Sequence, residues 1–151
     1  SLGQRCILAD PRRPEMKRTL NRRKQREEWI PLGVSCLAEQ GDAYFDHWQP
    51  SPFMTRLFRV RGDRRAEVPA AVHGDGSCRV QAVAGSADLF RKLLECFYGL
   101  TGTGMVLNSS LNRHGEPIVH RPADAMHLLL AGVIDELVIG DSVIKSDREA
   151  A

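Results

Sequence analysis

The spacing of apolar residues along the chain predicts four helices. Leucine and phenylalanine recur at helical spacing over 87–98, which is typical of an amphipathic helix packed on one side. A second helix is expected over 15–28, with apolar residues facing inward and Lys and Arg facing outward. A third is expected over 122–132, which begins with proline and ends with glycine. A short fourth helix is expected within 36–44.

Runs rich in β-branched and aromatic residues predict the strands between these helices. They lie at 5–10, 53–60, 68–72, 77–83, 105–107 and 135–140. The segments 68–72 and 77–83 flank His73-Gly74-Asp75-Gly76, and Asp-Gly tolerates the positive φ of a tight turn, so we expect a hairpin there. The alternation predicts one α/β (α+β) domain over 1–145, with a twisted mixed sheet and flanking helices. Residues 146–151 are expected to form a flexible tail.

Composition favours a soluble, cytoplasmic protein. Hydrophobic residues make up 42% and charged residues 26%, as in ordinary globular domains. No apolar run approaches the roughly 20 residues of a membrane-spanning helix, and no secretory signal opens the chain. The four cysteines are scattered without a Cys-x-x-Cys pair, which favours buried free thiols in a reducing compartment over a zinc site.

Positive charge is concentrated at the start of the chain. Residues 1–26 hold nine Lys and Arg against two acidic residues, whereas the remainder holds twelve against seventeen. The first segment would therefore attract an anion. Nucleic acid, a phosphorylated small molecule and an acidic protein surface all fit this charge, and so does a solvated basic helix face without any ligand.

Five sequence blocks, in order, resemble one family. They are L-G-Q-R-C-I-L-A-D-P-R at 2–12, N-R-R-K-Q-R-E at 21–27, S-P-F-M at 51–54, P-A-A-V-H-G-D-G-S-C-R-V-Q-A-V at 69–83 and N-S-S-L-N-R-H-G-E-P-I-V at 108–119. Each block alone is weak, but together they cover nearly the whole chain. They are similar to the carboxy-terminal domain of the O-carbamoyltransferases of nodulation-factor and antibiotic biosynthesis.

The resemblance implies a YrdC-like fold and a role in one half of a reaction. Such a domain would bind carbamoyl phosphate and ATP, with Mg²⁺ as part of the co-substrate, and form carbamoyl-adenylate. An amino-terminal transferase domain, which is not in this chain and which binds a metal, would pass the carbamoyl group to a hydroxyl of a natural-product or sugar acceptor. This chain is therefore expected to be an O-carbamoyltransferase fragment, incomplete for the full reaction, that binds no metal itself.

The matching blocks also name candidate site residues. Arg79 and Ser110 are the expected catalytic pair. The expected substrate- and nucleotide-binding residues are Arg5, Lys24, Arg26, His73, Asn108, Ser109, Asn112 and Glu116. Arginine forks and small hydroxyl or amide donors suit phosphate, and the sequence lacks the Gly-x-x-x-x-Gly-Lys-[Ser/Thr] loop that would otherwise bind it.

Each candidate has a structural alternative. The polar run 108–112 could cap its own backbone, and Arg79 could extend along its strand to solvent. Lys24 and Arg26 fit a solvated helix face as well as a ligand site, and Arg5 at a strand edge is similar. His73 and Asp75 lack a third ligand for a metal, so His73 is expected to bond substrate or backbone. Glu116 could hold Mg²⁺–ATP through water or orient its loop.

One departure from the family pattern affects the expected phosphate site. Ile30 stands where relatives usually have arginine, and the family's arginine upstream of Leu2 is absent. Weak nucleotide binding is therefore expected. The rival interpretation is a non-catalytic module that binds nucleic acid or docks another domain, although the basic segment has few aromatic residues for stacking on bases. We do not expect nucleic acid or membrane as partners.

Overall fold

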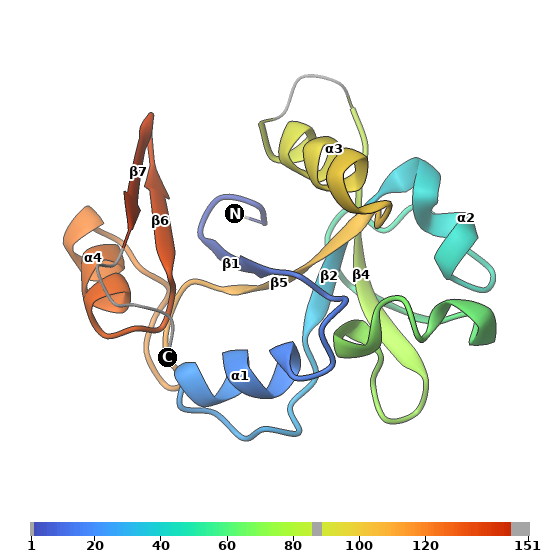
Figure 1. Cartoon of the computed structure of the whole chain (residues 1–151), viewed down its shortest axis with the longest axis horizontal. Helices are drawn as coiled ribbons and strands as arrows, with labels where there is room; N and C mark the ends of the chain where they lie inside the picture. Colours follow the sequence, from blue (N-terminus) through green and yellow to red (C-terminus); the bar gives the residue numbers. More distant parts are fainter. Residues whose placement is uncertain (1, 86–88, 146–151) are drawn as a thin grey trace.

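The computed structural model describes residues 2–85 and 89–145. Its main sheet has five strands in the spatial order β1-β5-β2-β4-β3 (Figure 1). The strands are β1 (Cys6–Ala9), β2 (Gly33–Leu37), β3 (Arg56–Arg59), β4 (Ser77–Val83) and β5 (Met105–Ser110). Only β2 and β4 run parallel; the other neighbours are antiparallel. The expected α+β domain with a mixed sheet is confirmed.

Helices and a small hairpin surround this sheet. The helices are α1 (Met16–Arg23), α2 (Gly41–Tyr44), α3 (Leu89–Thr101) and α4 (Pro122–Leu130), with 3-10 turns at Ala38–Gln40, Gly62–Arg64 and Pro69–Ala71. Strands β6 (Glu136–Ile139) and β7 (Ser142–Lys145) form a separate antiparallel pair beside α4 (Figure 1). No helix of the described residues is long and apolar enough to cross a membrane.

The two faces of the sheet are covered differently, because successive strand residues point to opposite sides. One face carries Val34, Cys36 and Val80, which are fully buried in the main core together with Leu20 from α1. The other face carries the smaller cluster of Leu37, Val83, Val106, Phe90 and Leu94, so α3 covers it. These apolar residues occupy only one end of the second face.

A polar row crosses the second face where the cover of α3 stops. Asn108 Nδ2 on β5 donates to Ser35 Oγ on β2 at 2.8 Å. Ser35 Oγ in turn donates to Gln81 Oε1 on β4 at 2.7 Å. Beyond this row the face continues without a covering helix to Gly33, Arg79 and Ser110, so the sheet itself leaves room for a site there.

The expected hairpin at His73–Gly76 is wrong. Residues Pro69–Ala71 form a 3-10 turn, and β4 instead pairs with β2 and with β3, the strand before it. The Asp-Gly turn is present, since the amide of Gly76 donates to the carbonyl of His73 at 2.9 Å. It joins β4 to an irregular segment because an alanine-proline run offers no alternating pattern to pair.

Several element bounds also differ from those expected. Strand β2 was not expected, and its last two residues fall within the segment 36–44 that was expected to form a short helix. Strand β3 is shorter than the expected 53–60. Strand β5 extends through Ser110, so much of the expected polar loop is strand, and β7 was not expected. Residues 87–88 of the expected helix and the tail 146–151 lie outside the described residues. Cys36 and Cys78 are buried thiols as expected, whereas Cys96 is exposed.

Candidate anion-binding site

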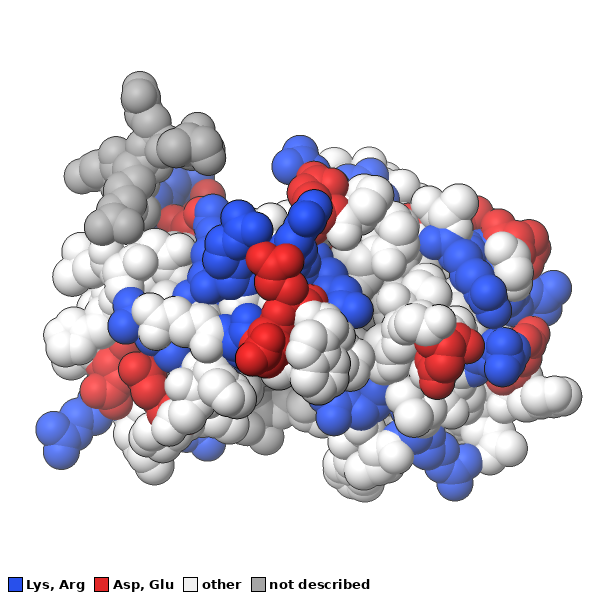
Figure 2. Space-filling model, turned by 90° about the horizontal axis from the view of Figure 1, so that it is seen from below, with Lys and Arg blue, Asp and Glu red and all other residues white. Residues whose placement is uncertain are grey.

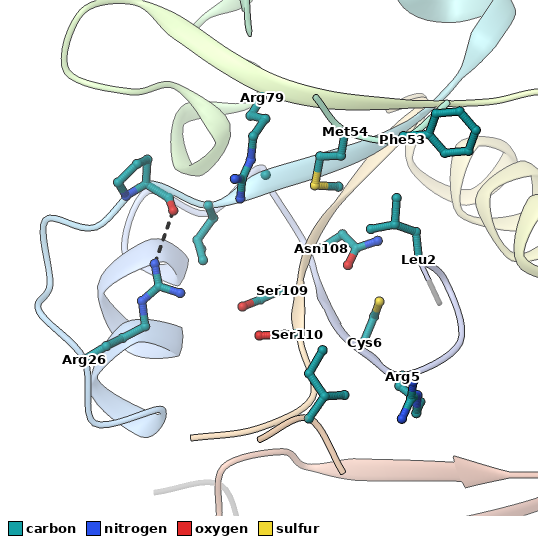
Figure 3. A pocket seen from close by; sticks show the side chains of 14 residues that line it. Leu2, Arg5, Cys6, Arg26, Phe53, Met54, Arg79, Asn108, Ser109 and Ser110 are labelled. Carbon is teal, nitrogen blue, oxygen red and sulfur yellow. Dashed lines mark hydrogen bonds between the residues drawn. The ribbon is translucent and has the colours of Figure 1, made fainter. Parts of the chain in front are cut away.

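A cavity of about 310 Å³ opens on the uncovered part of the sheet (Figure 3). Strands β1, β2, β4 and β5 supply its floor, and the segments after α1 and before β3 supply its sides. Its lining residues are Leu2, Arg5, Cys6, Arg26, Pro31, Leu32, Gly33, Phe53, Met54, Arg79, Asn108, Ser109, Ser110 and Ile118. The structure thus brings six of the ten predicted site residues around one space: Arg5, Arg26, Arg79, Asn108, Ser109 and Ser110.

The lining is cationic. Arg5, Arg26 and Arg79 line the cavity, and its described lining includes no aspartate or glutamate. Burial, and then the neighbouring charge of Arg79, lowers the pKa of Arg26. Arg26 donates to the carbonyl oxygen of Pro31 at 3.3 Å, while its buried Nε has no hydrogen-bond partner among the described residues. Cations that face one another in this way are stabilised when an anion lies between them.

Lys24 stands behind the cavity and is almost completely buried, with 2% of its surface exposed. Its Nζ donates to Ser109 Oγ at 2.9 Å, to Asn112 Oδ1 at 3.2 Å and to the carbonyl oxygen of Ser110. All these acceptors are neutral, and burial followed by the charge of Arg26 lowers the pKa of Lys24 to about 8. The solvated-face interpretation is therefore wrong for Lys24.

The backbone between these two cations is turned sharply. Helix α1 ends at Arg23, and Gln25 adopts a left-handed conformation with φ of 55°. For a residue with a side chain this conformation costs about 1–2 kcal/mol. The turn separates the directions of Lys24, which reaches toward β5, and Arg26, which reaches the cavity. Because of this turn, Lys24 contacts the end of β5 while Arg26 lines the cavity beside it.

A network of small polar side chains fixes the end of β5. Ser110 Oγ donates to Asn112 Oδ1 at 2.6 Å, and Asn112 Nδ2 donates to the carbonyl oxygen of Glu116 at 2.7 Å. Asn112 therefore orients Ser110 and Lys24 and does not itself line the cavity. Asn112 bonds the local backbone, as the structural alternative for the run 108–112 predicted. Asn108, Ser109 and Ser110 line the cavity.

His73 and Glu116 lie outside the cavity lining. The ring of His73 is held by the carbonyl oxygen of Leu32 at 3.0 Å and by Ser77 Oγ at 3.3 Å, so it positions the strand start beside the cavity. Asp75 accepts from Ser77 at 2.6 Å. Glu116 lines a second cavity of about 440 Å³ near α4. Within the described part of the chain, no three His, Cys, Asp or Glu side chains gather as metal ligands would.

The sequence reasoning missed the apolar side of the cavity. Met54 lines it in a left-handed conformation with φ of 57°, and Phe53 beside it is 75% exposed. Gly33 allows the close approach of Met54, because a Cβ at Gly33 would lie 2.6 Å from Met54 Sδ. The S-P-F-M block was the available signal, since it placed these residues in a family pattern without giving them a role.

The basic surface around α1 is interrupted by acidic residues. Figure 2 shows the face that bears α1, where Lys and Arg gather near the centre with acidic side chains between them. Arg22 pairs with Glu28 at 2.9 Å, and Arg23 pairs with Asp135 at 2.7 Å. The outward-facing charges of the helix are thus partly neutralised. Exposed ion pairs of this kind contribute little to stability. Lys24 differs from these residues because it is buried and has no acidic partner among the described residues.

Comparison with known proteins gives the same family across the chain. Residues 1–146 match the family model described as Carbamoyltransferase C-terminus. Nodulation protein NolNO of Sinorhizobium fredii is 37% identical over 150 residues, covering 96% of this chain and 22% of that protein. The 3'-hydroxymethylcephem-O-carbamoyltransferase of Amycolatopsis lactamdurans is 33% identical over 143 residues, covering 94% of this chain and 27% of that protein. The chain spans about a quarter of the length of these relatives.

Proposed function

Because the chain belongs to the carbamoyltransferase C-terminus family, we propose that its cavity binds ATP and carbamoyl phosphate and joins them as carbamoyl-adenylate. The observation that carries this proposal is a group of cations without acidic partners in the cavity lining, backed by the buried Lys24. A protein accepts the cost of burying such charges where an anion compensates them. Phosphates are the anions that arginine forks and serine hydroxyls bind best.

The proposed reaction transfers an adenylyl group to carbamate. Water attacks the carbonyl carbon of carbamoyl phosphate and inorganic phosphate leaves, which gives carbamate. A carbamate oxygen then attacks the α-phosphorus of ATP. The bond from that phosphorus to the bridging oxygen breaks, and pyrophosphate leaves with the electron pair. Negative charge builds on the phosphorus oxygens during this step, so positioning and charge neutralisation are the main tasks of the protein.

The residues of the cavity divide these tasks between them. Arg79 on β4 and Arg26 in the segment after α1 both line the cavity and would hold the phosphate oxygens (Figure 3). Ser110 would offer a hydroxyl to the same group, in an orientation set by Asn112. Lys24 would act through the strand end, since it contacts Ser109 and Ser110 and does not line the cavity. ATP would bring its Mg²⁺ as a co-substrate.

The relatives are about four times as long as the matched region, which leaves room for a further domain that carries out another step. We propose that a further domain of a longer polypeptide takes the carbamoyl group from the adenylate and transfers it to a hydroxyl acceptor. A non-catalytic nucleic-acid-binding module remains the second candidate from the charge of residues 1–26. The paired acids around α1 favour the small-anion interpretation over it.

The test compares ligands and one matched pair of variants. Calorimetric titration should show binding of ATP and carbamoyl phosphate but not of single-stranded RNA. Arg79→Ala should weaken phosphate binding roughly 10- to 100-fold, equivalent to about 1.5–3 kcal/mol for a charge-assisted hydrogen bond. Arg59→Ala, which removes an exposed arginine from the neighbouring strand β3, should leave binding unchanged. Equal affinities for the two variants, or tighter binding of RNA, would refute the proposal.

A further inference from the structure

A third cavity, of about 840 Å³ and larger than the two described above, follows the edge of strand β1. All four residues of β1, Cys6–Ala9, line it. Consecutive strand residues point to opposite faces of a sheet, so a space that touches all of them lies along the strand's edge. Among the described strands, β1 stands at the end of the five-stranded order and has β5 as its neighbour. The space therefore lies where a sixth strand would be.

The backbone of Leu8 faces this space. The carbonyl oxygen of Arg5 accepts from the amide of Leu111, so Arg5 turns its backbone toward the side of β5. Backbone groups alternate in direction along an antiparallel strand, which turns Ile7 and Ala9 toward β5 and Leu8 away from it. An outward N–H and C=O pair on an edge strand is a template for another strand.

Helices extend past this edge on both faces of the sheet. Leu89 and Leu93 of α3 line the groove above the sheet, and Met16 and Leu20 of α1 line it below. Strand β6 lies across from β1 (Figure 1), and its Val138 lines the same cavity and is 64% exposed. A strand placed in the groove would thus have apolar partners for its alternate side chains on both faces.

We propose that this groove binds one extended segment as a sixth strand against β1, supplied by the remainder of a longer polypeptide. The length of the relatives supports this source, because the matched region is only about a quarter of each protein. The occupant is an alternating strand with apolar side chains. About four of its residues would pair with β1, at roughly 3.3 Å per residue.

The walls of the groove argue against a second copy of this chain. A second β1 would bring its own α1 and α3, whose side chains project past its edge in the same way. These layers would meet α1, α3 and the β6–β7 pair before the two edges could join. A lone strand has no such layers and can enter between them.

The experiment follows hydrogen exchange of the Leu8 amide while a synthetic peptide is added. The peptide alternates threonine and valine over six residues, with lysine at each end for solubility. Exchange at Leu8 should slow at least tenfold at saturating peptide, because the amide becomes hydrogen-bonded. The same peptide N-methylated at alternate residues on its pairing edge should give no protection.

A matched pair of variants identifies the groove. Leu93→Glu places a charge on the groove wall and should abolish the protection, whereas Leu100→Glu, on the same helix but outside the groove and 86% exposed, should preserve it. Unchanged exchange at Leu8 with the peptide would overturn the proposal. So would a dimer in sedimentation analysis that Leu93→Glu dissociates, since a second copy would then be the occupant. Neither the hydrogen exchange of Leu8 nor the sedimentation depends on phosphate binding at Arg79, so this proposal and the proposed function can fail separately.

Discussion

Lys24 is the residue whose environment most constrains the site. A lysine with 2% of its surface exposed and only neutral oxygen partners bears most of its desolvation cost uncompensated. The charge of Arg26 repels Lys24, and the charge of Arg79 in turn repels Arg26. A bound phosphate would relieve both effects, so the affinity for anions and the ionisation of Lys24 should be linked.

This linkage predicts a pH dependence of phosphate binding. The pKa of Lys24 is lowered from 10.5 to about 8, so the side chain is charged below pH 8 and loses its proton above it. Binding of an anion favours the charged form, which means that binding above pH 8 takes up a proton. The affinity for phosphate should not change with pH below pH 8, and it should fall by up to tenfold per pH unit above pH 8.

Calorimetry in two buffers of different ionisation enthalpy would measure this proton uptake at pH 9. The ligand itself contributes little there, because phosphate groups with a pKa near about 6 are already ionised. Lys24→Gln should bind more weakly at pH 7 and show no proton uptake at pH 9. An uptake of the same size in that variant would assign the proton to another group.

The sequence blocks predicted many of the polar residues that line the cavity. Arg79, Ser110, Asn108 and Arg26 belong to blocks that resemble a family, and the structure places them around one cavity. The burial of Lys24 could not be predicted, because α1 ends at Arg23, five residues before the expected end at 28, and is followed by the left-handed Gln25. His73 matched the family block equally well, yet both of its ring nitrogens serve the local structure.

At the scale of elements, the site exists because α3 covers only one end of a sheet face. Its apolar residues meet Leu37, Val83 and Val106, and the polar row beyond them marks the boundary. Periodicity predicted α3 well, since helical spacing is local. It could not predict that β4 pairs with β2 and β3, because parallel and edge pairings depend on residues far apart in the chain.

Gly33, the first residue of β2, should not tolerate a side chain without a change in the cavity. A Cβ at Gly33 would lie 2.6 Å from Met54 Sδ and 3.3 Å from the carbonyl oxygen of Arg79. Gly33→Ala should therefore push the Met54 side chain from its place in the lining. We expect a modest loss of stability, about 1–2 kcal/mol as for other overpacked sites, together with a several-fold loss of phosphate affinity.

Urea denaturation and ATP titration of the same samples would separate these two effects. The double variant Gly33→Ala with Met54→Ala should recover part of the affinity by removing the displaced side chain. Gly99→Ala is the matched control, because nothing lies within 4 Å of a Cβ at that helical position. It should raise stability by about 0.5–1 kcal/mol without changing affinity. Full affinity in Gly33→Ala would show that Met54 can move without cost.

At the scale of the whole molecule, isoleucine in place of the family's usual arginine at position 30 does not leave the cavity without positive charge. Ile30 does not line the cavity, although Pro31 and Leu32 after it do. Its carbonyl oxygen accepts from Asn21 Nδ2 at 2.8 Å, which ties the segment to α1. The three arginines of the lining remain, so loss of a fourth leaves a cationic cavity. Weak nucleotide binding stays a prediction.

The final prediction concerns what this chain does without the further domain proposed above. Transfer of a carbamoyl group to an alcohol needs a group that removes the alcohol's proton near the electrophile. The described cavity lining offers arginine, serine, asparagine and cysteine, but no histidine or carboxylate for that task. We therefore expect this chain, incubated with ATP and carbamoyl phosphate, to release pyrophosphate slowly and to carbamoylate no hydroxyl acceptor. Radiolabelled carbamoyl phosphate with a sugar or a hydroxymethyl cephem would reveal any product. The Arg79→Ala variant should lose pyrophosphate release, which would link the signal to this cavity. A labelled acceptor from this chain alone would mean that the transfer step, too, takes place here.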